Sequence, residues 1–488
     1  MEPPHGNACP WLRIAAGLGT HDEGASGPAS RARTPPMPDH RTRRFLARAL
    51  AAAFLAGEWD RAGLTERARA TVIPPPRRLR HVVDRVLAAY PRPPRDAPRE
   101  LAAFVEVVLD AVRGRAGPPP PPAHVRRWLL DTGAMGPRRW PAVPDLATVA
   151  DLGAFLDLDA GRLAWLADVR SWERAAPDRR LRHYTYAWIA RPDAPVRLLE
   201  QPKPRLKAIQ RRLLHEVLAW IPAHPAAHGF VAGRSVAGHA AAHCGAPAVL
   251  RFDVEDFFVS LAAGRVWGVL RTAGYPEAVA HALTGLMTNS VAAGAWAEIP
   301  APSAPHLRRA HALLGRRLAA PHLPQGAPTS PMLANLCAFS LDRRLAGLAA
   351  RLGATYTRYA DDLVLSGGPG LARRAEKVTA TVRAIVADEG LRLNERKTRV
   401  MTAGGRQVVG GIVVNQRTNV PREEFDRLKA ILHNAARHGP ASQNRAGVAD
   451  FRAHLLGRIA WVAALNPARG ARLLRVFDAI DWDAAAAR

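Results

Sequence analysis

The chain has 488 residues, of which 69 are Lys or Arg and 42 are Asp or Glu, giving a formal charge of +27. This length allows two to four domains, and the positive excess favours a polyanionic partner, nucleic acid above all. The three cysteines form no Cys-x-x-Cys pair, which argues against a disulfide framework or zinc site and fits a reducing cytoplasm. No signal peptide is evident, and the apolar stretch 49–57 is too short to span a membrane.

The N-terminal third divides by composition. Residues 1–40 are rich in Gly, Pro, Arg and Ser, so we expect a disordered tail, in which Met37 offers an alternative start of the native protein. Apolar residues recur at helical spacing over 41–116, which predicts a helical N-terminal region. The run GPPPPP then predicts a stiff proline linker at 117–122, rather than a ligand for a proline-binding domain.

The region 123–179 is predicted to be helical, with two short helices joined by a turn near residues 157–161. Such a pair resembles a helix-turn-helix DNA reader. However, the second helix, AGRLAWLADV, carries few polar residues to read bases. A packed helical hairpin is therefore the preferred interpretation.

From about residue 180, strand-like stretches alternate with helices, and after 420 the pattern is helical again. AVLRFDVEDFFVSL (248–261) predicts a buried strand that Asp253 interrupts. A carboxylate there is costly unless a cation or donor meets it. ATYTRYADDLVLSG (354–367) predicts a β-hairpin with Asp361 and Asp362 at its tip.

If that strand packs beside the hairpin, the three carboxylates converge and repel one another unless a divalent cation joins them. Hard oxygen ligands without a nearby His or Cys suit Mg²⁺. Two Mg²⁺ ions would clamp an in-line displacement at phosphorus. The alternative is an ordinary turn on a surface hairpin.

The motifs resemble those of one enzyme family. The sequence Tyr-Ala-Asp-Asp at 359–362 resembles the signature hairpin of reverse transcriptases, and DVEDFF (253–258) their first metal-binding strand. LPQGAPTSPMLANL (323–336) is similar to the loop and helix that these enzymes place under the template–nucleotide pair, in a form that resembles bacterial retron reverse transcriptases. Four further stretches share that resemblance in the family's order: LKAIQRRLL (206–214), AHGFVAGRSV (227–236), LRLNERKTRVM (391–401) and GRIAWVAALNP (457–467).

The resemblance implies an α+β right-hand polymerase with fingers at 180–250, a palm with an antiparallel sheet at 251–418 and a helical thumb at 419–488, behind the extra helical N-terminal region. It implies an RNA-directed DNA polymerase that uses dNTPs to copy a cognate structured non-coding RNA into a short single-stranded DNA. It also implies a part in anti-phage defence, with a toxin or effector protein as a further partner. The alternatives are an intron-encoded or abortive-infection reverse transcriptase, or a non-catalytic RNA-binding scaffold.

The resemblance also assigns roles to individual residues. Asp253, Asp361 and Asp362 would be catalytic and would hold two Mg²⁺ ions. Phe258, five residues beyond Asp253, would lie against the sugar and exclude a 2′-OH, and the alternative for it is a core position.

Four further residues are implied to bind the nucleotide. Gln325 and Gly326 would line its pocket, where glycine lets the backbone approach closely. Arg197 would contact the triphosphate, because arginine suits bidentate phosphate binding, and its alternative is a solvated surface position. Lys397, one of few lysines in an arginine-rich chain, would lie near the pyrophosphate.

KPRLKAIQRRLLHE (203–216) predicts a basic amphipathic helix from its residue pattern alone. Contact between this helix and template phosphates would make binding sensitive to salt, and the alternative is a solvated charged face. The predicted nucleic-acid-binding residues are Lys203, Arg205, Lys207, Arg211 and Arg212.

Two stretches depart from the retron pattern. The usual Asn-Ala-x-x-His becomes His-Ala-Ala-Ala-His at 239–243, and the usual Val-Thr-Gly becomes Val-Gly-Gly at 409–411. Both sites are associated with handling the family's own RNA, so the departures leave open which RNA is recognised. His239 and His243 are four residues apart, but without a third ligand they do not predict a metal site.

Overall fold

The computed structural model describes residues 40–482 except 77, 95–96, 112–122, 130–134, 137–138, 177, 192–193, 300 and 303. The chain forms two compact units, Met1–Asp131 and Thr132–Arg488. Residues 1–39 of the predicted tail and the proline linker 117–122 lie outside the described residues. Within the described ranges, no helix is both long and apolar enough to cross a membrane.

The first unit is helical, as its apolar periodicity predicts. Leu50 and Phe54 on one face of the first helix are fully buried against a core that includes Leu64 and Val105. The Asp60 carboxylate accepts from the N–H of Gly63 and so caps the second helix. The elements of this unit are α1 (His40–Leu55), α2 (Arg61–Thr71), β1 (Val72–Ile73), α3 (Leu79–Ala89), α4 (Pro98–Ala111) and β2 (His124–Val125).

The second unit begins with the expected helical hairpin, formed by α5 (Val149–Leu156) and α6 (Ala160–Ala167). Thr148 and Asp151 form a capping box at the start of α5, and Asp159 caps α6. The apolar side of the hairpin lies in the same hydrophobic core as the central sheet described below. This hairpin is therefore an integral part of the second unit.

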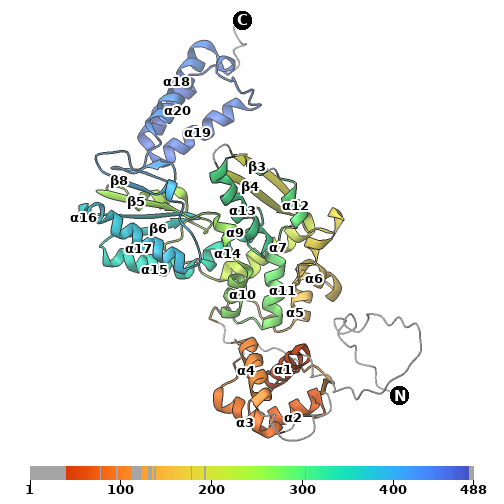
Figure 1. The fold of residues 1–488 in the computed structure, drawn as a ribbon. Helices are drawn as coiled ribbons and strands as arrows, with labels where there is room; N and C mark the ends of the chain where they lie inside the picture. Colours follow the sequence, from red (N-terminus) through yellow and green to blue (C-terminus); the bar gives the residue numbers. More distant parts are fainter. Residues whose placement is uncertain are drawn as a thin grey trace. The chain divides into compact units, whose positions relative to one another are not determined.

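Two strands, β3 (Tyr184–Arg191) and β4 (Ala194–Pro202), form a separate antiparallel hairpin (Figure 1). The chain then alternates between helices and strands, which confirms the mixed pattern predicted from about residue 180. The α-helices between β4 and residue 354 are α7 (Pro204–Glu216), α8 (Val236–Ala241), α9 (Phe257–Ser260), α10 (Ala263–Thr272), α11 (Glu277–Met287), α12 (Ala293–Ala297), α13 (Pro305–Ala319), α14 (Ser330–Cys337) and α15 (Phe339–Arg351).

A four-stranded antiparallel sheet in the order β6-β7-β5-β8 forms the centre of this unit. Alternate residues of these strands face opposite sides of the sheet. Leu250 and Leu363 enter the core shared with α15 and α17, which lie along the sheet in Figure 1. Val249 and Val364 enter a second core on the other side. The strands and flanking helices are β5 (Ala248–Asp253), β6 (Thr355–Tyr359), β7 (Asp362–Gly367), α16 (Pro369–Arg373), α17 (Ala375–Asp388) and β8 (Arg399–Thr402).

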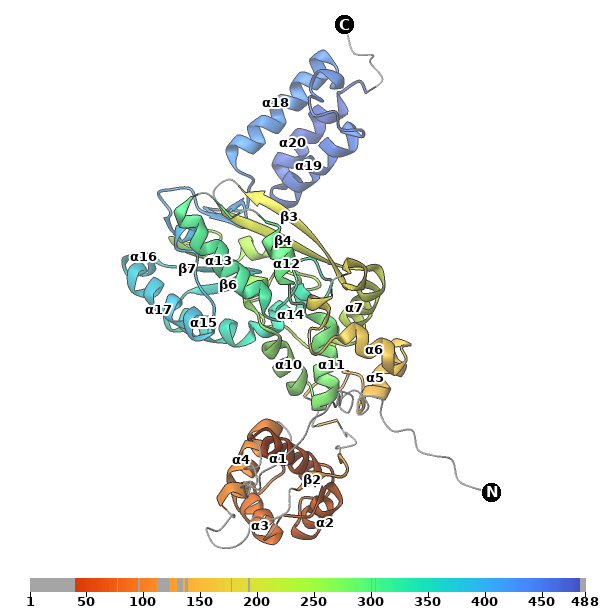
Figure 2. The ribbon, with the colours of Figure 1, turned by 45° about the vertical axis from the view of Figure 1, so that its right-hand side comes forward.

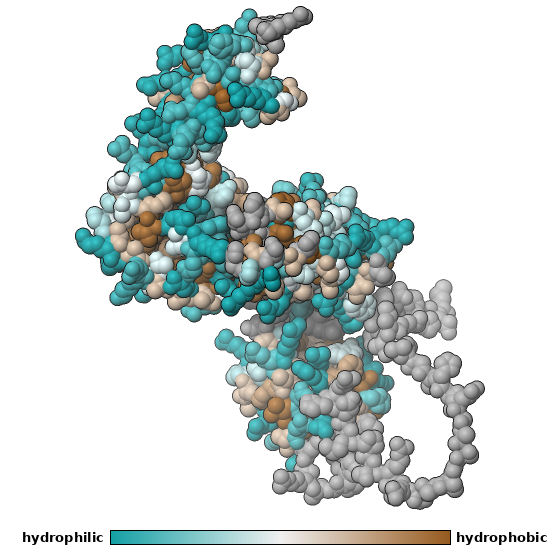
Figure 3. Space-filling model, turned by 45° about the horizontal axis from the view of Figure 1, so that its top comes forward, coloured by the Kyte–Doolittle hydropathy of each residue, from teal (hydrophilic) through white to brown (hydrophobic). Residues whose placement is uncertain are grey.

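The second core also contains apolar residues of the C-terminal helices, among them Leu432, Ile459 and Leu473. These helices pack on one another, as Figure 2 shows. Figure 3 shows hydrophilic residues over most of the visible surface, with apolar residues in small patches. The remaining elements are β9 (Val408–Val409), β10 (Ile412–Val413), α18 (Arg422–His438), α19 (Phe451–Leu465) and α20 (Pro467–Asp478).

A buried ion pair supports the β6–β7 hairpin. Arg358 of β6 and Asp342 of α15 are both fully buried, and the guanidinium donates Nε to Oδ1 at 2.8 Å and a second nitrogen to Oδ2 at 2.7 Å. Arg358 also donates to the carbonyl of Ala360 at 3.1 Å. Burial alone would lower the pKa of Arg358, but the Asp342 carboxylate raises it, so the guanidinium stays charged.

Replacing Asp342 by Asn should strongly destabilise the second unit, because it leaves the buried charge of Arg358 uncompensated. We expect the free energy of unfolding to fall by about 3–5 kcal/mol, measured by urea unfolding. The matched control is Asp388→Asn, which removes an exposed pair with Arg344 and should leave the midpoint nearly unchanged. Equal losses in the two variants would contradict this account.

Candidate active site

Three carboxylates meet where β5 ends and the β6–β7 hairpin turns. The register places Asp253 directly opposite Asp362, and the N–H of Val254 donates to the carbonyl of Asp361 at 2.9 Å. Asp361 lies in a two-residue turn with Ala360, whose φ of 54° suits such a turn but is costly for a non-glycine residue. Asp362, which was predicted to lie at the tip, is the first residue of β7, one position beyond the turn.

Two cationic side chains contact this acidic cluster. Lys397, at the end of the short helix η5 (Glu395–Lys397), places Nζ 2.8 Å from Oδ2 of Asp253. Arg251 donates Nε to Oδ1 of Asp362 at 2.8 Å. In the described part of the chain, no three His, Cys, Asp or Glu side chains are grouped closely enough to hold a metal ion. Two of the three carboxylates turn towards these cations instead.

The carboxylates nevertheless concentrate negative charge. Burial and then the neighbouring Asp253 raise the pKa of Asp361, while the charges of Lys397 and Arg197 act in the opposite direction. Burial also raises the pKa of Asp362, against the lowering effect of Arg251. The cluster therefore holds more negative charge than its two close cations compensate.

Phe258 lies on α9, five residues after Asp253, and its neighbour Phe257 fills the core. Phe257 is buried, whereas Phe258 is half-buried, and their ring centroids are 5.8 Å apart. The ring centroids of Phe258 and Phe230 are 6.2 Å apart. The core alternative therefore describes Phe257 better than Phe258.

The loop that carries Gln325 and Gly326 is joined to β4 through one residue. Glu200 donates its N–H to the carbonyl of Gln325 at 2.8 Å. Gly326 has a φ of 129°, and a Cβ there would lie 2.9 Å from the carbonyl oxygen of Glu200. Only glycine suits that position, since both its conformation and its close approach exclude a side chain.

The Glu200 side chain is fully buried in a polar network. Its Oε2 lies 2.9 Å from Nε2 of the buried His322, and its Oε1 accepts from Asn289 at 2.8 Å. Burial would lower the pKa of His322, but the Glu200 carboxylate raises it above the usual value. This pair fixes the Gln325 loop against β4, and the sequence analysis did not predict it.

Arg197 is exposed on β4, opposite Ile189 of β3. Its positive charge lowers the pKa of Asp361, so the guanidinium is within electrostatic reach of the acidic cluster. The structure thus brings together Asp253, Asp361, Asp362, Lys397 and Arg197.

The predicted basic helix exists as α7, with Leu206, Ile209 and Leu213 buried. Its five cationic residues differ in their surroundings. Arg212 binds Asp157 at 2.8 Å and Glu216 at 3.2 Å, so its charge is already paired. The exposed cationic side chains are Arg205, Lys207 and Arg211.

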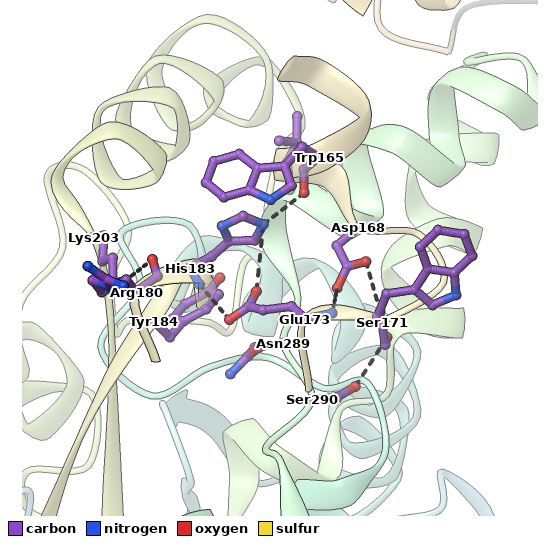
Figure 4. Close-up of polar contacts among 12 residues, drawn as sticks. Trp165, Asp168, Ser171, Glu173, Arg180, His183, Tyr184, Lys203, Asn289 and Ser290 are labelled. Carbon is purple, nitrogen blue, oxygen red and sulfur yellow. Dashed lines mark hydrogen bonds and ion pairs between the residues drawn. The ribbon is translucent and has the colours of Figure 1, made fainter. Parts of the chain in front are cut away.

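Lys203 does not extend into solvent. Its ammonium donates to the carbonyls of Arg179 and Arg180 at 3.2 and 2.9 Å (Figure 4). Figure 4 also shows the buried carboxyl group of Glu173, which accepts from the N–H of His183 at the start of β3. Burial raises the pKa of Glu173 to about 7.

His239 and His243 form a buried chain with two hydroxyl groups. Thr357 Oγ1 lies 2.7 Å from Nδ1 of His239 and 2.6 Å from Nε2 of His243, and His243 Nδ1 lies 2.7 Å from Oγ of Ser366. Burial lowers the pKa of His239 to about 3 and that of His243 to about 4, so both are neutral. A Cβ at Gly410 would lie 3.8 Å from the His239 ring, so the two departures from the retron pattern are neighbours.

Comparison with known proteins decides the family. Residues 189–430 match the family model described as reverse transcriptase (RNA-dependent DNA polymerase). The retron Mx65 reverse transcriptase of Myxococcus xanthus is 42% identical over 333 residues, 68% of this chain and 72% of that protein. The chain belongs to the retron reverse transcriptases. It is therefore an RNA-directed DNA polymerase, as the motifs predict.

Two other retron reverse transcriptases show the extent of the similarity. The Mx162 enzyme of Myxococcus xanthus is 36% identical over 358 residues, 70% of this chain and 69% of its own. The Ec86 enzyme of Escherichia coli is 32% identical over 244 residues, 50% of this chain and 66% of its own. Telomerase from Candida albicans overlaps in structure at 10% identity, covering 78% and 74% of the two chains, but its TM-score of 0.34 supports no argument.

The enzyme has site neighbours that its motifs did not predict. Arg251 lies two residues before Asp253 on β5, so the period of a strand already puts both on one face, and this signal was available. Glu200 and His322 are 122 residues apart and gave no such signal. Phe230 has a left-handed φ of 60°, but the sequence has no glycine at this position to indicate such a conformation.

Glu173 gives the enzyme a pH-dependent stability. The pKa of its carboxyl group is about 7 in the folded state, compared with an ordinary value of 4.5. The stabilisation of the folded state by the protonated carboxyl group is therefore complete below pH 4.5 and is lost as the pH rises towards 7. The loss should reach about 3 kcal/mol, since one pKa unit corresponds to about 1.4 kcal/mol. The side chain in Glu173→Gln cannot ionise. The free energy of unfolding of this variant, relative to that of the wild type, should therefore increase between pH 5 and 8. A constant difference over that range would exclude this assignment.

Proposed function

We propose that this reverse transcriptase copies its RNA template by two-metal nucleotidyl transfer at Asp253, Asp361 and Asp362. The supporting observation is the β5–β7 register, which places Asp253 opposite Asp362 with Asp361 adjacent. The hydroxyl group of the nucleic acid attacks the α-phosphorus of a dNTP. A P–O bond forms there, the bond to pyrophosphate breaks, and the hydroxyl proton is released.

Reverse transcriptases generally use divalent metal ions, and the donor set here fits Mg²⁺. Carboxylate oxygens are hard ligands. Burial first, and the neighbouring carboxylates second, raise the pKa values of Asp361 and Asp362, and a bound cation would favour their charged forms. When bound, two Mg²⁺ ions would activate the attacking hydroxyl and stabilise the departing pyrophosphate. Asp253 and Asp362 would exchange their contacts with Lys397 and Arg251 for contacts with the metal ions.

The surrounding residues would orient the nucleotide. We assign Arg197 to the triphosphate, because guanidinium groups bind phosphate oxygens in a bidentate manner and this one is exposed beside the acids. Lys397 would contact the departing pyrophosphate, because Asp253 holds its ammonium group at the acidic cluster. The loop with Gln325 and Gly326 would line the base-pair side of the pocket.

Phe258 would select the sugar. Its ring is half-buried and is linked through Phe230 to Tyr359 of the acidic hairpin. We assign it to the sugar of the nucleotide, where it would leave no room for a 2′-OH, so the enzyme would prefer dNTPs to ribonucleotides.

The proposed right hand has fingers at 180–250, a palm at 251–418 and a thumb at 419–488. The template would be a cognate structured RNA, which the enzyme converts to a short single-stranded DNA. The named relatives are retron enzymes, and this kinship supports a role in anti-phage defence with an effector protein. The charge of +27 supports the RNA partner.

The double substitution Asp361→Asn and Asp362→Asn should abolish DNA synthesis in a primer-extension assay with Mg²⁺. Binding of the RNA that purifies with the wild-type protein should remain near the wild-type level, because the substitutions remove no cationic side chain. Asp388→Asn, an exposed carboxylate on α17, is the matched control and should leave synthesis intact. Normal synthesis by the double variant would refute the assignment.

The exposed cationic side chains of α7 should set part of the salt dependence of RNA binding. Replacing Arg205, Lys207 and Arg211 together by Gln should weaken binding and reduce the slope of log K against log salt by about 2–3. Arg212→Gln is the matched control on the same helix, because Asp157 and Glu216 already pair that charge. An unchanged slope in the triple variant would assign α7 to the solvated-face alternative.

A further inference from the structure

Phe230 is an aromatic residue held in a rare conformation next to the acidic site. Its side chain is 45% exposed, and its φ of 60° lies in the left-handed region. A bulky residue seldom adopts this backbone conformation, which persists only where the surroundings impose it. Such outliers are concentrated at functional sites, so the cause of this one is worth tracing.

The surroundings bind the Phe230 loop to the catalytic hairpin. The N–H of His228 donates to the carbonyl of Arg358 at 2.7 Å, and Ala227 forms a parallel bridge to Arg358. Asn335 of α14 is buried and donates to the carbonyl of Gly229 at 2.8 Å. A Cβ at Gly229 would lie 2.9 Å from the backbone nitrogen of Ala360, so the loop backbone lies directly on the hairpin turn.

This attachment places the Phe230 ring between two residues of the site. Its centroid lies 6.2 Å from that of Phe258 and 6.1 Å from that of Tyr359, with tilted planes. Both separations are within the range in which aromatic pairs attract. The buried Phe257 also contacts Phe258, at 5.8 Å between centroids, so two aromatic rings pack against the Phe258 ring.

We propose that Phe230 is a specificity-determining residue that completes an aromatic wall with Phe258 and Tyr359 against the sugar of the nucleotide. This inference rests on the proposed role of Phe258. A ring excludes a 2′-OH only if it cannot move away when the larger sugar enters. The contacts of Phe257 and Phe230 with the Phe258 ring would restrict such movement. The exposed face of Phe230 remains available to contact the nucleotide or the end of the primer.

The test compares kcat/KM for a dNTP and the matching ribonucleotide in primer extension by the full-length enzyme. Phe230→Gly removes the ring and also relieves the left-handed backbone, so the melting temperature should not fall. We expect its preference for the dNTP to drop about tenfold, mainly through faster ribonucleotide incorporation. Phe230→Tyr should keep the preference. Phe45→Ala, which removes an exposed phenylalanine in the first unit, should leave it unchanged.

Phe258→Ala separates this inference from the proposed function. If Phe258→Ala relaxes sugar selection but Phe230→Gly does not, the inference is overturned and the role of Phe258 stands. If neither variant relaxes selection while both extend primers with dNTPs, the role of Phe258 is wrong and the inference fails with it. Loss of selection in Phe230→Gly only together with a lower melting temperature would indicate a structural role and would also overturn it.

Discussion

The buried pair of Arg358 and Asp342 is the constraint on which the acidic site depends. Removing two charges from water is expensive, and the cost is recovered only with near-ideal geometry and further hydrogen bonds. Both conditions hold here: the contact is bidentate, Tyr356 donates to the same carboxylate at 2.8 Å, and Arg358 reaches the carbonyl of Ala360. Because Ala360 immediately precedes Asp361, the pair fixes the turn that carries the acids.

A second consequence of this arrangement is electrostatic. A chain with a large positive excess contains a cluster of three carboxylates. In the proposed function, a polyanionic template and a triphosphate must both approach this cluster. Lys397 and Arg251 reduce the local repulsion by contacting Asp253 and Asp362. The basic surface attracts the nucleic acid over a longer range, while these short contacts keep the acids ordered.

The sequence was sufficient for the features that depend on local pattern. The mainly apolar run 248–254 predicted β5. The strand-like stretches on either side of Asp361 and Asp362 predicted the hairpin, although the turn begins one residue earlier than expected. Features that depend on distant partners were not predictable. Glu200 and His322 meet only after folding. The carbonyls that bind Lys203 and the Asp157 carboxylate that binds Arg212 also lie outside α7. A charge pattern therefore could not tell exposed cations from paired ones.

The helical hairpin α5–α6 also changes where the polymerase begins as a folding unit. The match to the reverse transcriptase family model starts at residue 189, yet Leu152, Leu156 and Leu163 lie in the same core as Leu250 and Leu363. A protein shortened to the matched region would expose the apolar surface that these leucines cover. The minimal autonomous enzyme must therefore extend upstream to at least the segment around Val143. A further module could be exchanged without disturbing that core only if it lies before this segment.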